Sequence, residues 1–181
     1  MIVEDCRGKC YLCEDSVHTA PNVEHRISHE NDAALKYDWN NLLLACYHCN
    51  NTKLDKYNGI IDPTKVDPEA LIDLSLDLDE ELREKVIVRK ISGGRDTDIT
   101  IDLLNAVYNG QNTDMKKYSC QQLKNKLSNE LSWFRQKLEA YRANPNDANE
   151  AVIRQEISDT AIFAAFKRGI IKTVFHALPL S

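Results

Sequence analysis

Apolar and polar residues are arranged differently in successive parts of the chain, and these changes divide it into three segments. In the first segment, residues 1–58, the stretch 22–29 (NVEHRISH) alternates apolar and polar positions as a short strand does. The apolar run 41–44 (NLLL) fits a second strand, and 49–57 (CNNTKLDKY) fits the start of a helix. A turn signal, Asn58-Gly59, ends the segment. The first segment therefore predicts two strands followed by a helix.

The second segment, residues 59–115, is acidic and mixed in pattern. Its first part, 60–74 (IIDPTKVDPEALIDL), contains two prolines and is typical of a connecting segment. The stretch 85–91 (KVIVRKI) predicts a strand that Gly93 and Gly94 close. The stretch 98–110 predicts a short helix that ends at Gly110.

The third segment, residues 116–181, has a helical pattern. Apolar residues recur every three or four positions from Ser119, which forms a candidate capping box with Gln122. NPND (144–147) breaks this helix, and a second helix is predicted from Asp147 to Phe175. The core candidates of the two helices are Leu123, Leu127, Leu131, Phe134, Leu138, Tyr141, Ile153, Ile157, Ala161, Ala164 and Phe166. The simplest interpretation is that the two stripes pack on each other, and the alternative is a face that binds a partner.

Composition places the chain among soluble globular proteins, with 43% hydrophobic and 28% charged residues in 181. It contains no apolar stretch of about 18 residues, so we expect no membrane span. Its first residues, MIVEDCRGKC, have neither the apolar core nor the cleavage site of a signal peptide. We therefore expect a cytoplasmic protein.

The net charge of −5 is unusual for a protein that binds nucleic acid. The charge is uneven, because residues 116–181 carry 11 basic and 6 acidic side chains while the first two segments are acidic. Any attraction to phosphates must therefore come from the last third or from a partner. Lys167, Arg168 and Lys172 predict a basic face there, and the alternative is a solvated helix end.

Four of the six cysteines form two C-x-x-C pairs, Cys10 with Cys13 and Cys46 with Cys49. Two such pairs can surround one ion with a tetrahedron of sulfur, which predicts a structural zinc site. In a reducing compartment, metal binding is favoured over disulfides. The 32 residues between the pairs exceed the spacing of a simple zinc ribbon, so a folded insert must lie between them.

Three neighbouring residues have no assigned role. Cys6 and Cys120 fit no pattern and are expected to be small buried side chains. His48 lies inside the second pair and would bind zinc only if one of the four cysteines did not.

The first segment contains several motif points in a fixed order. They are Glu24-His25, then Asn41-Leu42, then Cys49-Asn50-x-x-Lys53, enclosed by the two C-x-x-C pairs. Together they resemble the HNH endonucleases, also called ββα-metal nucleases. The resemblance covers about 45 residues and implies an α+β protein. Its core, residues 1–58, would be a zinc-tied ββα unit, followed by the acidic mixed segment 59–115 and the helical extension 116–181. That extension would bind a partner or nucleic acid.

Phosphodiester cleavage requires a base, a nucleophilic water and positive charge near the leaving oxygen. His25 is the natural base, because imidazole titrates near neutral pH. Glu24 and Asn50 offer oxygen ligands to a catalytic Mg²⁺ or Mn²⁺ ion that is distinct from the structural Zn²⁺. Glu24 stands where the family more often has aspartate, and neighbouring side chains on a regular strand diverge.

The remaining site residues have positioning or phosphate-binding roles in this hypothesis. Lys53, one turn after Asn50, is placed to hold a phosphate oxygen, and the alternative is a solvated lysine. His29 is either a second phosphate contact or a surface histidine. By resemblance, Asn41 fixes the loop that carries the histidine. The spacing to Lys53 favours Asn50 over Asn51 as the metal ligand.

Outside this module, IIDPTKVDPE, TIDLLN and AFKRGIIK resemble the nuclease subunit (PtuB) of Septu-type anti-phage defence systems, including retron-associated forms. That resemblance implies a hetero-oligomer with an ATPase of the ABC or SMC type (PtuA-like). The substrate of the nuclease would be DNA or RNA. The main alternative is a non-catalytic zinc module that docks a partner protein or nucleic acid. A four-cysteine redox switch is a third hypothesis.

Overall fold

The computed structural model describes residues 2–17 and 20–174. The first third contains α1 (Ile2–Asp5), β1 (Asn22–His25), α2 (Ala33–Tyr37), the short 3-10 helix η1 (Trp39–Asn41), β2 (Leu42–Ala45) and α3 (Tyr47–Lys53). The middle contains η2 (Pro68–Ala70), β3 (Ile72–Leu78), β4 (Glu84–Lys90) and α4 (Arg95–Asn109). The last third contains α5 (Asp114–Ala143), α6 (Asp147–Glu156) and α7 (Ala164–Val174). The predicted α+β class is confirmed.

The strands β1 and β2 form an antiparallel pair in which His25 lies opposite Leu42. Cys46 follows β2 directly and caps α3, because its sulfur accepts a hydrogen bond from the Cys49 amide. The strand–strand–helix order predicted for the first segment is therefore present. Asn41 belongs to η1, one residue before β2.

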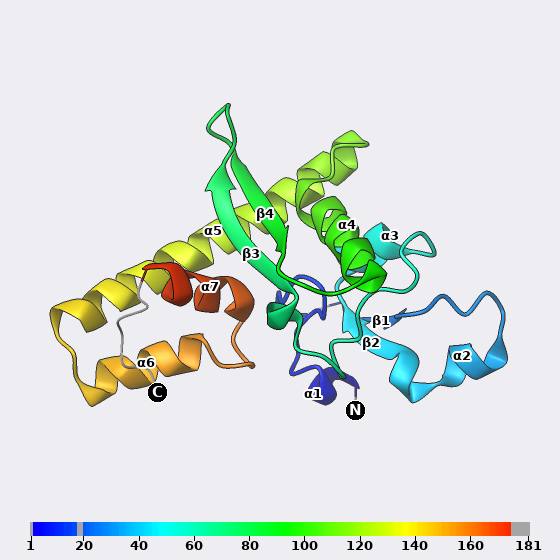
Figure 1. Ribbon diagram of the computed structural model, residues 1–181, viewed down its shortest axis with the longest axis horizontal. Coiled ribbons are helices and arrows are strands. Elements are labelled where there is room, and N and C mark those ends of the chain that lie inside the picture. Colours follow the sequence, from blue (N-terminus) through cyan, green and yellow to red (C-terminus); the bar gives the residue numbers. More distant parts are fainter. Residues whose placement is uncertain (1, 18–19, 175–181) are drawn as a thin grey trace.

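A second antiparallel hairpin, β3 with β4, projects from the body of the molecule (Figure 1). The strand β4 was predicted, but β3 was assigned to a connecting segment. Its sequence, IDLSLDL, alternates apolar and polar residues, and the two prolines before it concealed this pattern. Helix α4 packs against β4, and α7 packs against β3.

Gly93 and Gly94 close β4 as predicted, and Gly93 has a geometric reason to be glycine. Its φ is +98°, and a Cβ atom there would lie 2.2 Å from the Thr97 hydroxyl oxygen. Gly94 then begins α4, and Gly110 ends it.

The long helix α5 begins earlier than predicted, at Asp114 instead of Ser119. Its N-cap is Thr113, whose hydroxyl accepts from the Lys116 amide. The first turn carries no residue of the apolar stripe, so hydrophobic periodicity could not detect it. Proline 145 separates α5 from α6, as predicted.

The predicted helix from Asp147 to Phe175 is wrong in its middle, because α6 ends at Glu156 and α7 begins at Ala164. The polar residues between them, Ser158 to Thr160, form turns, and the Ser158 hydroxyl donates to the Gln155 carbonyl oxygen. Phe163 then takes a φ of +52° and is fully buried. Phe175 lies outside the described residues.

One hydrophobic core joins the three segments of the chain. It contains Leu44 and Cys49 from the first, Leu103 and Val107 from α4, and Leu127 from α5. A smaller cluster between α5 and α6 holds Phe134, Leu138, Tyr141 and Ile153, so the two predicted stripes do pack together there. Within the described part of the chain, no helix combines the length and apolar character needed to cross a membrane.

Candidate functional site

Four sulfurs meet where the first hairpin joins α3. The Sγ atoms of Cys10, Cys13, Cys46 and Cys49 all lie within 4.8 Å of one another. Cys13 Sγ is 3.9 Å from Cys46 Sγ. Zinc–sulfur bonds of about 2.3 Å in a tetrahedron place sulfurs about 3.8 Å apart, so this spacing suits one zinc ion. The cluster joins the two ends of the ββα unit.

The four cysteine thiols have pKa values that are shifted in opposite directions. Hydrogen bonds from Cys10, Cys13 and Cys49 hold the pKa of Cys46 far below its usual range, whereas hydrogen bonds from neighbouring sulfurs and burial raise the pKa values of Cys13 and Cys49. Three of the four cysteines are buried, so negative charge there needs a positive partner. A zinc ion held by the four sulfurs would supply that charge, and the four cysteines predicted from the sequence are the ones that meet.

The three unassigned residues lie outside the zinc cluster. His48 turns away from it, and its Nε2 lies 2.8 Å from the Val107 carbonyl oxygen of α4. The Cys120 thiol donates to the same carbonyl at 3.1 Å. Cys6 accepts a hydrogen bond from the Leu44 amide at 3.4 Å and is only partly buried. All three serve packing in this structure.

His25 lies at the end of β1, and its ring is fixed by one backbone contact. Its Nε2 is 3.0 Å from the Lys36 carbonyl oxygen at the end of α2. A carbonyl oxygen only accepts hydrogen bonds, so Nε2 must carry the proton. In the neutral ring, Nδ1 then has a lone pair that can accept a proton. The carbonyl has no signal in the side-chain sequence, so this contact could not be predicted.

His29 lies beside His25, with ring centroids 4.8 Å apart in an edge-to-face arrangement. Its Nδ1 accepts a hydrogen bond from the Asn31 amide at 3.1 Å. In the neutral ring the proton is therefore on Nε2, which can donate to an oxygen of a ligand. The structure thus brings together two imidazoles with complementary abilities, one to accept and one to donate.

Asn41 is buried and bridges the loop that carries both histidines. Its Oδ1 accepts from the Ile27 amide at 2.8 Å, while its Nδ2 donates to the Ile27 carbonyl at 2.9 Å. The same Nδ2 donates to the Leu35 carbonyl oxygen at 3.0 Å. One side chain thereby ties the segment after β1 to α2, next to the carbonyl that holds His25.

Glu24 and Lys53 face each other in the interior. The Lys53 ammonium is fully buried and donates to Glu24 Oε1 at 2.9 Å and to the His25 carbonyl oxygen at 2.8 Å. It also lies 3.3 Å from the Leu54 carbonyl oxygen. The three N–H donors of Lys53 are thus used, and its ammonium does not reach the protein surface, where it could contact a phosphate. Burial raises the pKa of Glu24, although the hydrogen bond from Lys53 opposes this.

Asn50 lies on the same face of α3 as Lys53, because the two are three positions apart in the helix. Asn50 is partly buried, whereas Asn51 is exposed on a different face. Helical geometry therefore directs Asn50, and not Asn51, toward β1. Glu24, the other predicted oxygen ligand, lies on β1, and its Oε1 accepts the hydrogen bond from Lys53.

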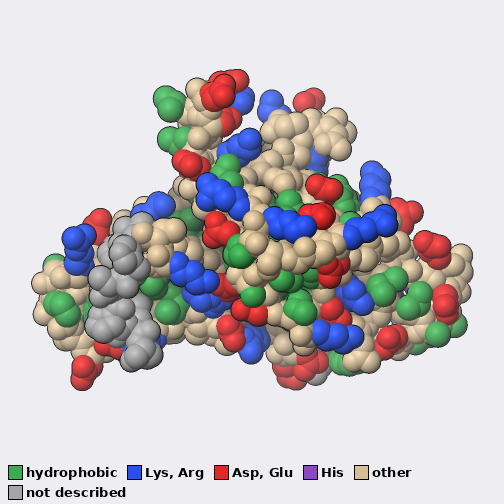
Figure 2. All heavy atoms as spheres, in the orientation of Figure 1, with side chains coloured by type: hydrophobic (Ala, Val, Ile, Leu, Met, Phe, Trp, Pro, Cys, Tyr) green, Lys and Arg blue, Asp and Glu red, His purple; other side chains and the backbone are tan. Residues whose placement is uncertain are grey.

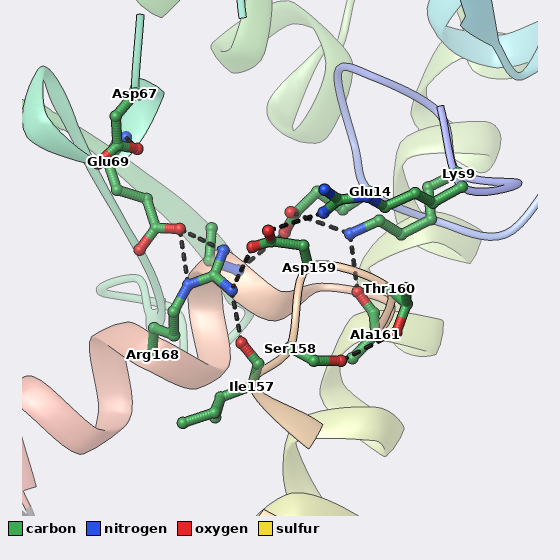
Figure 3. Close-up of polar contacts among 12 residues, drawn as sticks. Lys9, Glu14, Asp67, Glu69, Ile157, Ser158, Asp159, Thr160, Ala161 and Arg168 are labelled. Atoms are coloured by element: carbon green, nitrogen blue, oxygen red, sulfur yellow. Dashed lines mark hydrogen bonds and ion pairs between the residues drawn. The ribbon is translucent and has the colours of Figure 1, made fainter. Parts of the chain in front are cut away.

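A cavity lies elsewhere, between the N-terminal segment, residues 60–74 and α7. It measures about 1000 Å³, and Lys9, Tyr11, Glu14 and Arg168 are among its lining residues. Figure 3 shows the charged side chains at its edge paired with one another. The Glu14 carboxylate accepts from the Ala165 amide at 2.9 Å, and Lys9 donates to the Ala161 carbonyl oxygen at 2.9 Å.

The basic residues predicted as a face on α7 are mostly engaged in the interior. Lys167 is 1% exposed and pairs with Glu130 and Glu156. Arg168 pairs with Glu69, and the Lys172 ammonium, on a well-exposed side chain, lies 3.6 Å from the same carboxylate. These partners neutralise the charge, so a continuous basic face is not formed by these three residues.

Residues 10–56 match the family model described as HNH endonuclease. The match includes both C-x-x-C pairs and the segment from β1 to α3, so the HNH resemblance of this part is confirmed. It ends at residue 56 and covers about a quarter of the chain. No curated protein and no solved structure matches the chain.

Proposed function

We propose that this chain is a divalent-metal-dependent endonuclease that hydrolyses phosphodiester bonds in nucleic acid, with His25 as the general base. The observation that supports it most is the contact between His25 Nε2 and the Lys36 carbonyl oxygen. It holds the ring in the tautomer that leaves Nδ1 free to take a proton from water. The HNH match at residues 10–56 supports the same reaction class.

The residues around His25 have distinct roles in this proposal. His29 Nε2 donates to a phosphate oxygen, and its edge-to-face contact with His25 places it on the same side of the loop. Asn41 is a positioning residue, since it orders the loop and does not face a reacting atom. This arrangement keeps a proton acceptor and a proton donor beside one phosphate.

A bound Mg²⁺ or Mn²⁺ ion supplies positive charge for the phosphate and the leaving oxygen. The donors fit such an ion in part. Asn50 offers a neutral oxygen from the face of α3 that meets β1. Glu24 has one oxygen engaged by Lys53, so only its second oxygen is available as a ligand. Lys53 itself is assigned to holding Glu24 and the end of β1, and not to a phosphate.

The four cysteines have a structural role in this proposal. Zinc at Cys10, Cys13, Cys46 and Cys49 fixes the start of α3 relative to the first hairpin, and so the position of Asn50 relative to His25. Zinc here would not contact the substrate, because the cluster is almost entirely buried.

We further propose that the protein acts in the cytoplasm as the effector subunit of an anti-phage defence complex, together with an ATPase of the ABC or SMC type. The short resemblances to the Septu and retron-associated PtuB family support this role. The charge also supports it, because an acidic nuclease gains from a partner that delivers the nucleic acid.

The proposal is tested with the protein purified alone and with its neighbouring gene products, incubated with DNA or RNA in Mg²⁺ or Mn²⁺. His25→Ala should reduce cleavage by about 100- to 10,000-fold, the range for loss of a general base. Zinc content and thermal stability should stay at the wild-type level, and added imidazole should restore part of the activity. His48→Ala is the matched control, since His48 contacts α4 and not the site.

Unchanged cleavage by His25→Ala would exclude His25 as the base. If neither the wild-type chain nor the complex cleaves any nucleic acid, while zinc is bound, the non-catalytic zinc module is the better hypothesis. Reversible thiol oxidation in a protein without zinc would favour the redox switch.

A further inference from the structure

Two aromatic side chains stand exposed on the loop between β1 and β2. Tyr37 ends α2 and is 75% exposed, while Trp39 begins η1 and is 59% exposed. Figure 2 shows hydrophobic side chains at the surface over the α2 end of the molecule. Exposed rings of this size lose the stabilisation that burial would give them, so a binding role is a reasonable explanation.

The loop that carries these rings is held in place by side-chain caps. Asp32 accepts from the Ala34 amide at the start of α2, and Asp38 accepts from the Asn40 amide at the start of η1. Asn41 joins this loop to Ile27, as described above. The backbone on which Tyr37 and Trp39 stand is therefore ordered before any ligand binds, which lowers the entropic cost of binding.

The same loop holds the proposed base. The carbonyl oxygen that accepts from His25 belongs to Lys36, and that carbonyl is bonded directly to the Tyr37 nitrogen. The Lys36 ammonium lies 5.6 Å from the centre of the Tyr37 ring. A ligand that stacks on Tyr37 thus lies next to the backbone unit that fixes His25.

Charge alone gives this loop little attraction for a polyanion. Between residues 29 and 41 the acidic residues are Glu30, Asp32 and Asp38, against one basic residue, Lys36. The whole chain is also acidic. Nucleic acid held here therefore needs a contribution that does not depend on phosphate charge, and base stacking on aromatic rings provides one.

We propose that Tyr37 and Trp39 form a stacking platform for unpaired bases, so that the favoured substrate is a single-stranded segment of DNA or RNA. This inference rests on the proposed nuclease function. In a duplex the base faces are already stacked on one another, and only the terminal pairs can meet a ring. Unpaired bases on the two rings would lie on the loop whose Lys36 carbonyl oxygen holds His25.

The surroundings of the two rings favour this ligand over a protein partner. Their sequence neighbours Lys36, Asp38 and Asn40 are all polar and exposed. The buried centre of a protein interface is depleted of charged residues. Aromatic rings on the surface can instead stack on the faces of unpaired bases, and such stacking tolerates any base.

The chain allows a direct fluorescence test, because it has two tryptophans, Trp39 on η1 and Trp133 on α5. In Trp133→Phe with His25→Ala, which prevents cleavage, Trp39 is the single reporter. Titration with a thymidine or uridine homo-oligonucleotide should quench its emission, and a blunt duplex of equal length should not. Trp39→Phe with His25→Ala is the matched control, since the 61% exposed Trp133 should then show no quenching.

Binding and cleavage measurements complete the test. Trp39→Ala and Tyr37→Ala should each weaken single-strand binding by about 5- to 150-fold, the range for loss of one stacked base. Trp133→Ala should bind like wild type. Zinc content and thermal unfolding check that each variant is folded. We expect folding in each case, because the replaced side chains are exposed.

Equal quenching by duplex and single strand, or unchanged binding by Trp39→Ala, would overturn the stacking platform and leave the function of His25 standing. Loss of co-purification with the ATPase subunit in Trp39→Ala, with oligonucleotide binding unchanged, would also overturn it and assign the rings to a protein interface. Failure of the nuclease function is recognised separately, as absence of cleavage of every nucleic acid by the wild-type protein.

Discussion

Replacing Lys53 by methionine distinguishes a structural lysine from one that contacts substrate. The substitution keeps most of the aliphatic stem and removes the ammonium. Three acceptors then lose their donor, namely Glu24 Oε1 and the carbonyl oxygens of His25 and Leu54. The side chains of Lys53 and Glu24 are 0% and 7% exposed, so water cannot replace the lost contacts without opening the site.

The expected loss of stability follows from this burial. Removing one partner of a buried ion pair costs about 3–5 kcal/mol, because the other charge stays uncompensated. That is a large share of the 5–15 kcal/mol that stabilises a typical domain. For a chain of this length it corresponds to a fall of about 6–20 °C in the unfolding midpoint.

The pH dependence of the variant provides a second signature. Burial already raises the pKa of Glu24, and the substitution removes the hydrogen bond and the charge of Lys53, the two largest effects that oppose it. A carboxyl group whose folded-state pKa is raised destabilises the protein as the pH rises from the unfolded-state value of about 4.3 through the folded value. Lys53→Met should therefore be less destabilised at pH 5 than at pH 8.

Urea unfolding followed by circular dichroism, at constant zinc concentration, measures these effects. The double variant Glu24→Gln with Lys53→Met should recover part of the loss, since it removes the orphaned charge. A loss below about 1 kcal/mol in Lys53→Met, together with a large fall in cleavage, would refute the buried pair and return Lys53 to a phosphate-binding role.

Other predictions concern zinc, the histidine loop and acid stability. Cys13→Ser should fail to hold zinc and lose cooperative unfolding, whereas wild type should hold one zinc ion per chain by elemental analysis; zinc retained at wild-type stoichiometry would contradict the site. Asn41→Ala leaves the Ile27 amide and carbonyl without their partner, so it should cost about 1–3 kcal/mol and lower cleavage with zinc content unchanged. Lys137 and Lys167 hold the pKa of Glu156 below its usual range against the opposing effect of burial. The stability from these two ion pairs of Glu156 is present above the unfolded-state pKa of about 4.3 and is lost as the pH falls through the lower folded-state pKa. Glu156→Gln should flatten this acid dependence in thermal unfolding measured from pH 6 to pH 3.

The sequence predicted parts of the chain whose signals are local. The two C-x-x-C pairs, the strand–strand–helix order and the apolar stripe of α5 depend on spacing and periodicity, which a single chain displays directly. Local signals also located some helix ends, such as Pro145 after α5 and Gly110 after α4. Their failures have a local cause too: prolines before β3 concealed its alternation, and the first turn of α5 lacks apolar residues.

The roles of charged residues could not be predicted in this way, because they depend on partners from distant segments of the chain. Lys53 has the spacing of a phosphate contact on α3. Its ammonium is instead buried and donates to Glu24, 29 residues earlier in the chain. The sequence predicted a basic face at Lys167 and Arg168. In the folded chain, both side chains form ion pairs with glutamates from other segments, namely Glu130, Glu156 and Glu69.

The sequence by itself determined the four cysteines that cluster, the ββα order and the identity of His25 as the candidate base. The tertiary structure decided the tautomer of His25, through the backbone carbonyl of Lys36, and the buried pairing of Lys53 with Glu24. The physical reason is that ligand type and periodicity belong to residues close in sequence. Desolvation, ion pairing and backbone contacts instead arise between segments that meet only when the chain has folded.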